Sequence, residues 1–310
     1  MNKTPKLFIL AGAVLASLFL FVSIVYNNFV QKSIYEENSR HLLSTYEQVD
    51  KTFTMFVQHN WNALSDWSNN LQYLDDAENM KTLWYDFARR KDAWQYQDFY
   101  MFNENCDFIT AAGRDGNAPN IQGIFLDMYE TGQPVISSYI ASDSNRRIVF
   151  ALPMDVPYTI NGITYSGLAV SYNNDVVEKL IAGNIYQEQS DCYILTSDGN
   201  VLLSLEPKTE FLQKISNLFD FLNKYTNMTE TEITDLKKNI KNVSTGSLQC
   251  RYNNKNYYLV YEPTGINDWT IVGIIHDDVV DASMRRIQSI TIVLLLILNG
   301  CIALLLTGTV

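Results

Sequence analysis

The sequence predicts an α+β protein in which one long helix is followed by two antiparallel sheet units, with a membrane-spanning helix at each end of the chain. Three observations support this fold class. Apolar residues recur at helical spacing through a stretch without Gly or Pro, and strand-like segments with alternating apolar residues follow that stretch. An uncharged apolar run stands at each end of the 310 residues.

The charge balance argues against a nucleic-acid partner. Apart from Lys3 and Lys6, which precede the first apolar run, the chain has 21 basic and 34 acidic residues, a net charge of about −13. Nucleic-acid binding needs a basic face that neutralises phosphates, so we expect none. The four cysteines are scattered and the three histidines form no metal-binding motif. We therefore also expect unpaired thiols, no metal site and no cofactor.

The first apolar run, residues 7–25, is 19 residues long and uncharged. At about 1.5 Å per residue this run is long enough to cross a hydrocarbon core of roughly 30 Å. A cleaved signal peptide is the alternative, but its apolar core would have only about 7 to 15 residues and would end at a small-residue cleavage site. We predict an uncleaved membrane anchor. Lys3 and Lys6 lie before it, so residues 1–6 are expected in the cytoplasm.

The second apolar run, residues 290–310, is interrupted only by Asn299 and Gly300. With two spans, residues 26–289 would lie outside the cytoplasm at the cell membrane, although Arg285 and Arg286 argue mildly for the opposite orientation. The sequence stops where the chain would reach the cytoplasm. We therefore expect a fragment that holds the input half of a signalling protein.

Residues 26–97 are predicted to form a stalk region. No Gly or Pro occurs between Gln31 and about Ala93, and we expect residues 31–74 to form one helix of about 66 Å. Its apolar stripe is wide, which favours packing along a folded domain. Whether the helix also joins two copies in a homodimer, together with the spans, is left open by the pattern. The stripe consists of Leu42, Tyr46, Val49, Phe53, Phe56, Val57, Trp61, Leu64, Trp67, Leu71 and Leu74.

The first sheet unit is predicted over residues 98–183. Five strand-like segments lie at residues 98–103, 107–112, 134–141, 146–154 and 165–172. Asn161 and Gly162 stand between the last two, and this pair readily takes the positive φ angles of a tight hairpin. A helix over residues 175–181 leads out of the unit.

The second sheet unit is predicted over residues 184–289. It begins with a hairpin at residues 192–204. Helices are expected at residues 208–225 and after the capping box Thr229–Glu232. Three strands follow, at residues 247–252, 256–262 and 269–276. Two strands, a helical insert and three strands are the order of a PAS-like sheet.

With these segments in order, the chain resembles the double Cache family, the extracellular sensory modules of bacterial chemoreceptors, histidine kinases and diguanylate cyclases. The resemblance rests on residues 131–137 (TGQPVIS), 147–153 (RIVFALP), 167–170 (GLAV), 193–202 (YILTSDGNVL) and 269–273 (WTIVG). It implies two PAS-like subdomains, a membrane-distal one at residues 98–183 and a membrane-proximal one at 184–289. It also implies a small-molecule pocket in the distal subdomain, between its sheet and the helices and loops over one face.

The resemblance does not extend to the residues that hold amino acids in this family. Members that bind amino acids carry an Arg-x-Trp-Tyr run before the third strand and an Asp at the end of the fifth. The corresponding positions here are Gln122, Ile124, Phe125 and Tyr172. A carboxylate favours a guanidinium partner and a buried ammonium group needs a carboxylate. We therefore expect this chain to bind its ligand through other contacts than those that hold amino acids in the family. Arg114, Arg146 or Arg147 could supply a positive charge from another direction.

The candidate ligand-binding residues are aromatic or basic side chains expected near the distal pocket. Aromatic walls with a few polar groups suit a small organic ligand, and core packing is the alternative for any one of them. The candidates are Trp94, Tyr96, Tyr100, Arg114, Phe125, Tyr139, Arg147 and Tyr172.

The function implied by the resemblance is an extracytoplasmic ligand-sensing input module of a transmembrane signal-transduction receptor. By family analogy we expect a histidine kinase output outside this chain, with a diguanylate cyclase or chemoreceptor as alternatives. A stand-alone two-span adaptor is a further alternative. An enzyme is not expected, because no catalytic motif frames the acidic pairs of the sequence.

Overall fold

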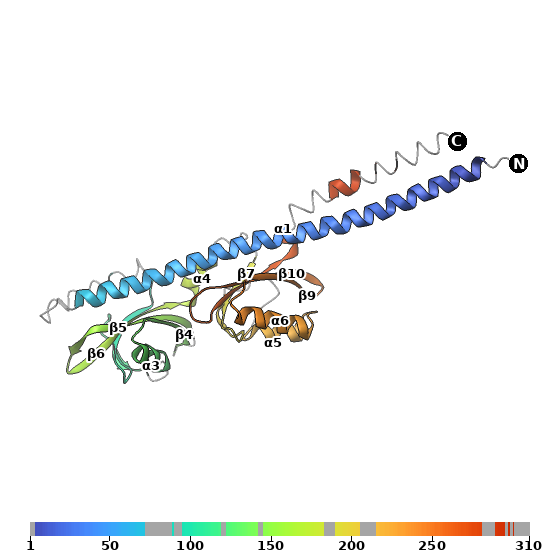
Figure 1. Cartoon of the computed structure of the whole chain (residues 1–310). Helices are drawn as coiled ribbons and strands as arrows, with labels where there is room; N and C mark the ends of the chain where they lie inside the picture. The colour runs from blue at the N-terminus through green and yellow to red at the C-terminus, as the bar shows by residue number, and fades with distance from the viewer. Residues whose placement is uncertain are drawn as a thin grey trace.

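Helix α1 (Thr4–Leu71) dominates the computed structural model, and two antiparallel sheet units lie in a row beside it (Figure 1). The structure describes residues 4–71, 89, 95–118, 122–141, 145–182, 190–204, 215–280, 289–294, 297 and 300. The helix predicted from residue 31 is confirmed as far as Leu71. It is continuous with the segment predicted as the first span, and the rest of the stalk up to residue 94 lies almost wholly outside the described residues.

Among the described residues, no helix is both long and apolar enough to cross a membrane.

The distal unit is a six-stranded antiparallel sheet in the order β3-β2-β1-β6-β5-β4. All five predicted strands are confirmed, and the Asn161–Gly162 turn has the expected positive φ angles of 52° and 80°. The short strand β3 and the helix α3 were not predicted. The elements are β1 (Asp98–Phe102), β2 (Asp107–Thr110), β3 (Asp115–Asn117), α3 (Gln122–Thr131), β4 (Val135–Ile140), β5 (Arg146–Ile160), β6 (Ile163–Asn173) and α4 (Asn174–Ala182).

The proximal unit is a five-stranded antiparallel sheet in the order β8-β7-β11-β10-β9, and all its predicted strands are confirmed. Its capping box is also confirmed, because Thr229 Oγ1 accepts from Glu232 N at 3.3 Å and the Glu232 carboxylate accepts from Thr229 N at 2.8 Å. The elements are β7 (Ser190–Leu195), β8 (Val201–Ser204), α5 (Leu218–Tyr225), α6 (Glu230–Lys241), β9 (Gly246–Tyr252), β10 (Lys255–Pro263) and β11 (Thr270–His276).

The helix predicted over residues 208–225 starts later in the structure than predicted. Asn217 is extended, forms a bridge with Asn200, and accepts hydrogen bonds from the backbone N–H groups of Phe219 and Asp220. An Asn side chain in this position caps a helix, so α5 starts only at Leu218. Residues 205–214 lie outside the described residues.

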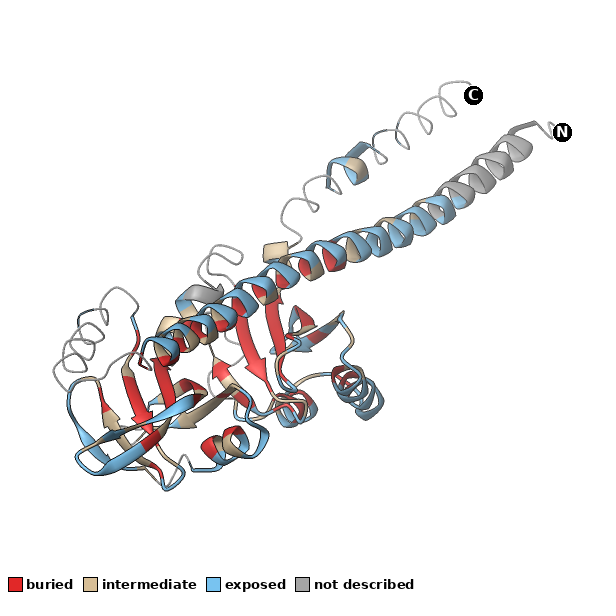
Figure 2. Cartoon of the chain, turned by 60° about the vertical axis from the view of Figure 1, so that its left-hand side comes forward, coloured by how far each residue is buried: buried red, intermediate tan, exposed pale blue. Residues whose placement is uncertain are grey.

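Helix α1 covers one face of both sheets with the predicted apolar stripe (Figure 2). Residues of the stripe such as Leu42, Phe53 and Leu64 belong to one core cluster that also contains side chains of both sheets. The opposite faces are covered separately, by α3 on the distal sheet and by α5 and α6 on the proximal sheet. The helix therefore joins the two units through a shared core. Cys106, Cys192 and Cys250 are buried and free, as expected.

Helix α1 packs tightly against β11 at Gly273. A Cβ atom built on Gly273 would lie 1.8 Å from Cζ of Tyr46, far inside van der Waals contact. Tyr46 is fully buried, so its ring occupies the space that a side chain at position 273 would need. The close packing of α1 on the proximal sheet therefore depends on a glycine at this position.

We predict that Gly273→Ala destabilises the protein by about 1–3 kcal/mol or more, because α1 must move away from β11 to admit the methyl group. The measurement is the free energy of unfolding of the full chain in denaturant. Gly123→Ala on α3 is the matched control, since nothing lies within 4 Å of its Cβ position. Equal losses in the two variants would contradict this account.

Acidic side chains gather where α1 meets β10. Burial, together with the carboxylates of Asp50 and Glu47 on α1, raises the pKa of Glu262 to about 7. Burial also raises the pKa of Asp50, against the effect of the neighbouring Lys51. The contact between helix and sheet therefore becomes more crowded with negative charge as Glu262 ionises.

The sign of the resulting pH dependence follows from this shift. Because the pKa of Glu262 is about 7 when folded and near 4.5 when unfolded, the folded state binds more protons in that range, and stability falls as the pH rises through it. We predict that Glu262→Gln reduces the fall in melting temperature between about pH 5 and about pH 8. Glu104→Gln in an exposed turn is the control. An unchanged pH profile in the Glu262 variant would refute this assignment.

Candidate functional site

A pocket of about 450 Å³ opens on the distal sheet, on the face that does not contact α1. Side chains alternate between the two faces of the sheet along β1. Phe99 and Met101 belong to the core under α1, whereas Tyr100 and Phe102 belong to the cluster under α3 and therefore lie on the face of the pocket. The lining side chains with polar groups include Asp98, Tyr100, Thr110, Arg114, Tyr139 and Arg147.

The charged centre of the pocket is Asp98, which pairs with two arginines. Its Oδ1 lies 2.6 Å from Nη2 of Arg114, and its Oδ2 lies 3.3 Å from Nη1 of Arg147. The side chains of Asp98 and Arg147 are sheltered, at 17% and 13% exposed, whereas Arg114 is 67% exposed. The ion pair between Asp98 and Arg147 is therefore shielded from solvent. The ion pair between Asp98 and Arg114 lies at the surface, where such pairs are weak.

Hydroxyl groups stand beside this charged centre. Thr110 accepts from the backbone N–H of Arg114 at 3.0 Å and fixes the turn that brings Arg114 to the pocket. Burial raises the pKa of Tyr100 well above its usual range, and the nearby Tyr139 raises it further. The Tyr139 side chain is the neighbour of the buried Tyr100 hydroxyl, so the two phenol groups lie together at the pocket wall.

The structure brings four of the eight candidate residues together and places three others elsewhere. Tyr100, Arg114, Tyr139 and Arg147 line the pocket, and Tyr139 is the cross-strand partner of Arg147. Trp94 lies outside the described residues.

Tyr96, Phe125 and Tyr172 are core residues away from the pocket lining. The Tyr172 hydroxyl donates to Oδ1 of Asn60 on α1 at 2.7 Å, and Tyr96 lies in the same core. The ring of Phe125 on α3 stacks on Phe102, with 3.7 Å between centroids. These three positions were expected near the distal pocket, Phe125 and Tyr172 because they correspond to ligand-holding positions of the family and Tyr96 as an aromatic side chain, whereas the structure places all three in the core.

Sequence reasoning missed Asp98, the residue at the charged centre of the pocket. A signal was present, because Asp98 stands two positions before Tyr100 on the same strand, and such residues share a face. Its two arginine partners are 16 and 49 positions away in sequence, so the pairing itself depends on the sheet.

Arg146, the remaining arginine considered for the pocket, points instead to the proximal unit. Its Nη1 donates to the carbonyl oxygens of Val201 and, at 3.1 Å, of Leu202. Both carbonyls belong to β8, the edge strand of the proximal sheet. Partial burial of its guanidinium group lowers the pKa of Arg146.

Two amides add to this contact between the units. Asn174 at the start of α4 donates to the carbonyl of Ser204 at 2.8 Å, and Asn267 donates to the carbonyl of Ile136 on β4 at 3.0 Å. The strands that carry Tyr139 and Arg147 are therefore the same strands that hold the proximal unit.

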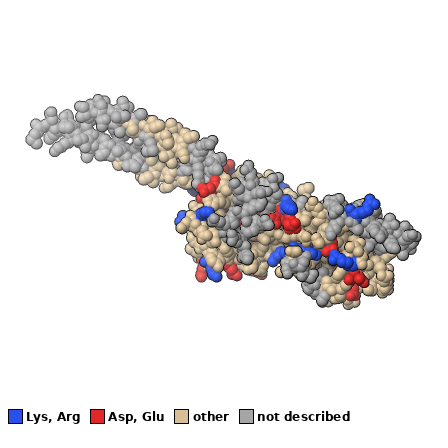
Figure 3. Space-filling model, turned by 180° about the vertical axis from the view of Figure 1, so that it is seen from behind, with Lys and Arg blue, Asp and Glu red and all other residues tan. Residues whose placement is uncertain are grey.

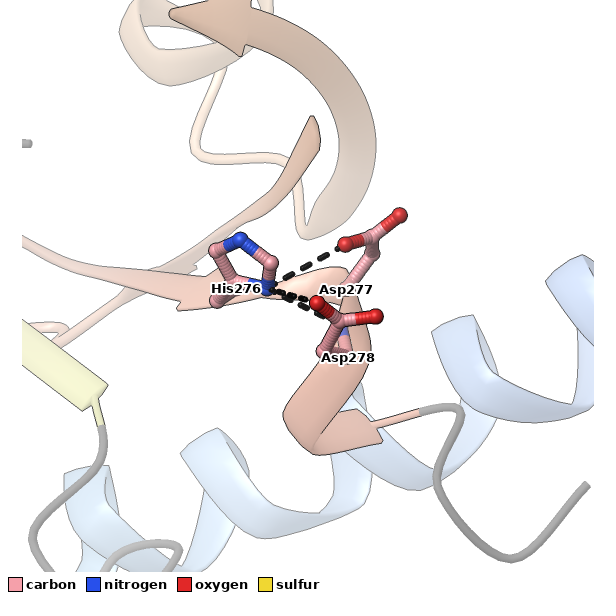
Figure 4. A group of neighbouring side chains, drawn as sticks. All are labelled: His276, Asp277 and Asp278. Atoms are coloured by element: carbon pink, nitrogen blue, oxygen red, sulfur yellow. Dashed lines mark hydrogen bonds and ion pairs between the residues drawn. The ribbon is translucent and has the colours of Figure 1, made fainter. Parts of the chain in front are cut away.

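A second group of chemically active side chains lies at the end of β11 (Figure 4). Nδ1 of His276 accepts from the backbone N–H of Asp278 at 3.1 Å, and carboxylate oxygens of Asp277 and Asp278 lie 3.2 and 3.4 Å from that nitrogen. The three side chains could share a metal ion, since their ligand atoms lie within 4.8 Å of one another. No other feature of the described residues points to an ion, so we assign this cluster to capping the strand end. The expected absence of a metal site stays a prediction.

No protein-family model and no curated protein matches the chain. Solved structures do match. The sensory domain of the Campylobacter jejuni chemoreceptor Tlp3 (CcmL), with isoleucine bound, is 11% identical with a TM-score of 0.56, over 82% of this chain and 98% of that chain. The ligand-binding domain of the Pseudomonas aeruginosa PAO1 amino acid chemoreceptor PctB, in complex with L-Arg, is 13% identical with a TM-score of 0.57, over 78% and 97%.

A third similar structure comes from a different class of receptor. The extracellular domain of mmHK1S-Z3, assigned as a histidine kinase, is 13% identical with a TM-score of 0.54, over 78% of this chain and 98% of that chain. At such identities the likeness concerns the fold alone. Each match covers nearly all of the other chain, so the likeness extends over a complete sensory domain. The chain therefore has the fold of a double Cache sensory domain, as the resemblance implied.

Proposed function

We propose that the chain is the extracytoplasmic ligand-sensing module of a transmembrane signal-transduction receptor, without catalytic activity of its own. The observation that carries the proposal is the distal pocket, where Tyr100, Arg114, Tyr139 and Arg147 surround Asp98. A concave site with aromatic walls and a few converging polar groups is the usual form of a small-molecule site. The similar structures support it, since two were determined with an amino acid bound.

The membrane arrangement is part of the proposal: residues 1–6 in the cytoplasm, spans at 7–25 and 290–310, and residues 26–289 outside. Helix α1 extends beyond the proximal unit, and its described projecting part exposes Phe21, Val22, Ile24, Val25 and Phe29. On the face in Figure 3 that part carries no charged side chain. The helical residues 289–294 lie toward the same end (Figures 1 and 2). This arrangement makes the unit of residues 98–183 membrane-distal and the unit of residues 184–289 membrane-proximal.

A homodimer through the stalk and the spans belongs to the same proposal. Where α1 packs on the sheets, its outward side is mostly polar, with Lys51, Gln58 and Asn62 exposed. The projecting part is apolar and exposed. We therefore place the dimer contact in the projecting part and the spans.

For the cytoplasmic output we propose a histidine kinase, supported by the likeness to mmHK1S-Z3. A chemoreceptor is the alternative that the likeness to Tlp3 and PctB favours. Reading the gene beyond Val310 distinguishes a kinase, a cyclase, a chemoreceptor signalling domain and a stand-alone adaptor.

We predict that a metabolite screen finds a compound that raises the melting temperature of the full chain in detergent, and that Tyr139→Ala abolishes the rise. A ligand that binds only the folded state stabilises it, and Tyr139 lines the pocket. Tyr225→Ala, at an exposed position of α5, should keep the rise. A screen without any stabilising compound, or an undiminished rise in the Tyr139 variant, would contradict the proposed site.

The contact between the units gives a further prediction. Arg146→Gln should lower the free energy of unfolding by about 1–3 kcal/mol, because two carbonyls of β8 lose a charged donor. Hydrogen exchange should also become faster in β8 than in β10. Arg251→Gln is the control, since its Nε donates to Asn256 inside the proximal unit. Unchanged exchange in β8 would show that Arg146 does not hold this strand.

A further inference from the structure

We propose that an aromatic cluster of the proximal unit, formed by Phe221, Tyr225 and Tyr252, contacts the lipid headgroup layer of the bilayer beside the two spans. The proximal unit is then held at the membrane surface by its own side chains as well as by the spans. The inference rests on the membrane arrangement of the proposed function, because it adds a second contact with the same bilayer.

The two ends of the proximal sheet face in opposite directions. The β10–β11 turn faces the distal unit, since Asn267 in this turn donates to the carbonyl of Ile136 on β4 at 3.0 Å. Antiparallel pairing places Tyr257 of β10 opposite His276 of β11, so the β9–β10 turn and the C-terminal end of β11 share the other end of the sheet. In Figure 1, β9 lies on the side toward which the N-terminal part of α1 projects. The β9–β10 turn is therefore on the side of the predicted spans.

The aromatic cluster lies at this same end of the sheet. The ring centroid of Phe221 on α5 lies 5.5 Å from that of Tyr252, the last residue of β9, and 5.1 Å from that of Tyr225. Asn227 accepts from the backbone N–H of Arg251 at 2.6 Å, which holds the chain after α5 against β9. Phe221 and Tyr252 are half-buried against the proximal core, whereas Tyr225 is 51% exposed. The cluster therefore has a fixed base and an exposed phenol ring.

The distance from the cluster to the membrane follows from the packing of α1 along the sheet. Tyr46 packs on Gly273, and nearer the N-terminus Tyr35 stacks on Tyr258, with 5.9 Å between ring centroids. Tyr35 is ten residues, about 15 Å, beyond the first predicted span. Because β10 begins three residues before Tyr258, the β9–β10 turn is nearer to the span by up to about 10 Å.

The β9–β10 turn thus lies about 5–15 Å beyond the end of the span, according to how far β10 is inclined to α1. The headgroup layer extends roughly 5–8 Å beyond the hydrocarbon core. The long side chains around the turn are therefore within reach of this layer.

The chemistry of the cluster suits a membrane surface. Aromatic rings with a polar end are the side chains that gather where a membrane meets water. Tyr225 presents such a ring, and Nζ of Lys224 lies over it, 5.1 Å from the centroid. Tyr26, at the end of the first predicted span, is 43% exposed and would lie in the same layer on α1. Aromatic side chains of α1 and of the proximal unit therefore approach the headgroup layer together.

Charged side chains of both signs surround the aromatic cluster. Lys224, Arg251 and Lys255 are exposed, and so are Glu230 at the start of α6 and Asp278 after β11. Attraction between a basic surface and anionic lipids is therefore not the basis of the proposal. The contact is made by the rings, and we expect it in a bilayer of zwitterionic phosphatidylcholine.

The test places the full chain in phosphatidylcholine nanodiscs in which a fraction of the lipids carries a nitroxide quencher on the headgroup. A fluorescent label is attached in turn to three variants. Lys255→Cys is beside the cluster, since residue 255 pairs with Tyr252, and Phe29→Cys is on the projecting part of α1. Val243→Cys is the matched control, because Val243 is 68% exposed and precedes β9 at its other end. The unsubstituted chain gives the background of labelling.

We expect the labels at positions 29 and 255 to lose most of their fluorescence and the label at position 243 to keep it. Tyr225→Ser together with Tyr252→Ser should restore most of the fluorescence at position 255, because the unit then lacks the rings that hold it at the headgroups. Tyr225→Ser alone changes an exposed side chain and should restore part of it. Met55→Ser, at a 72% exposed position on α1 far from the predicted spans, should leave the quenching unchanged.

The other outcomes contradict separate parts of the proposal. Quenching at position 29 without quenching at position 255 refutes the contact and leaves the membrane arrangement standing. Undiminished quenching at position 255 in the double Tyr→Ser variant refutes the role of the rings. Rapid disulfide crosslinking between two copies of the Lys255→Cys variant, without quenching, assigns the cluster to a second copy of the chain. If the label at position 29 is not quenched either, the proposed membrane arrangement fails together with this inference.

Discussion

The structure depends on the packing of one helix stripe against two sheets. Buried residues of α1, from Leu42 to Leu71, share a single core with side chains of both units. Among the described residues, the two units also meet through side-chain hydrogen bonds to backbone carbonyls. The helix therefore adds a shared apolar core to these polar contacts. The packing of Tyr46 on α1 against Gly273 sets the distance between this helix and the proximal sheet.

This arrangement leaves the opposite face of the distal sheet available for a pocket. In an antiparallel sheet, side chains alternate between faces, so the same strands serve the core and the pocket. Arg146 and Arg147 on β5 are an example: Arg147 reaches Asp98 in the pocket, and Arg146 reaches β8 of the proximal unit. A shift of this end of β5 would move both contacts at once. The pocket and the contact between the units are therefore connected through adjacent residues of β5.

Local patterns in the sequence predicted the elements that local interactions determine. The stripe of α1, the Asn161–Gly162 turn and the Thr229 capping box each depend on residues close in sequence, and all are present. Helix α3 was missed because its first turn contains Gly123 and its helical form depends on packing of Phe125 and Met128 against the sheet. Tyr172 was assigned to the pocket although Leu168 and Val170 share its face. Asp98 was missed because its partners are distant in sequence.

A ligand can change the state of this protein only by the difference in its affinity for two arrangements. The contacts of Arg146 are to neutral carbonyls, so they are weaker and more easily rearranged than a pair with a carboxylate. The α1 core is close-packed and cannot deform gradually. Movement driven from the pocket is therefore expected to appear at the joint between the units rather than between α1 and the sheets. Because Tyr46 of α1 packs tightly against Gly273 of β11, the proximal sheet is expected to stay with α1 while the joint between the units changes.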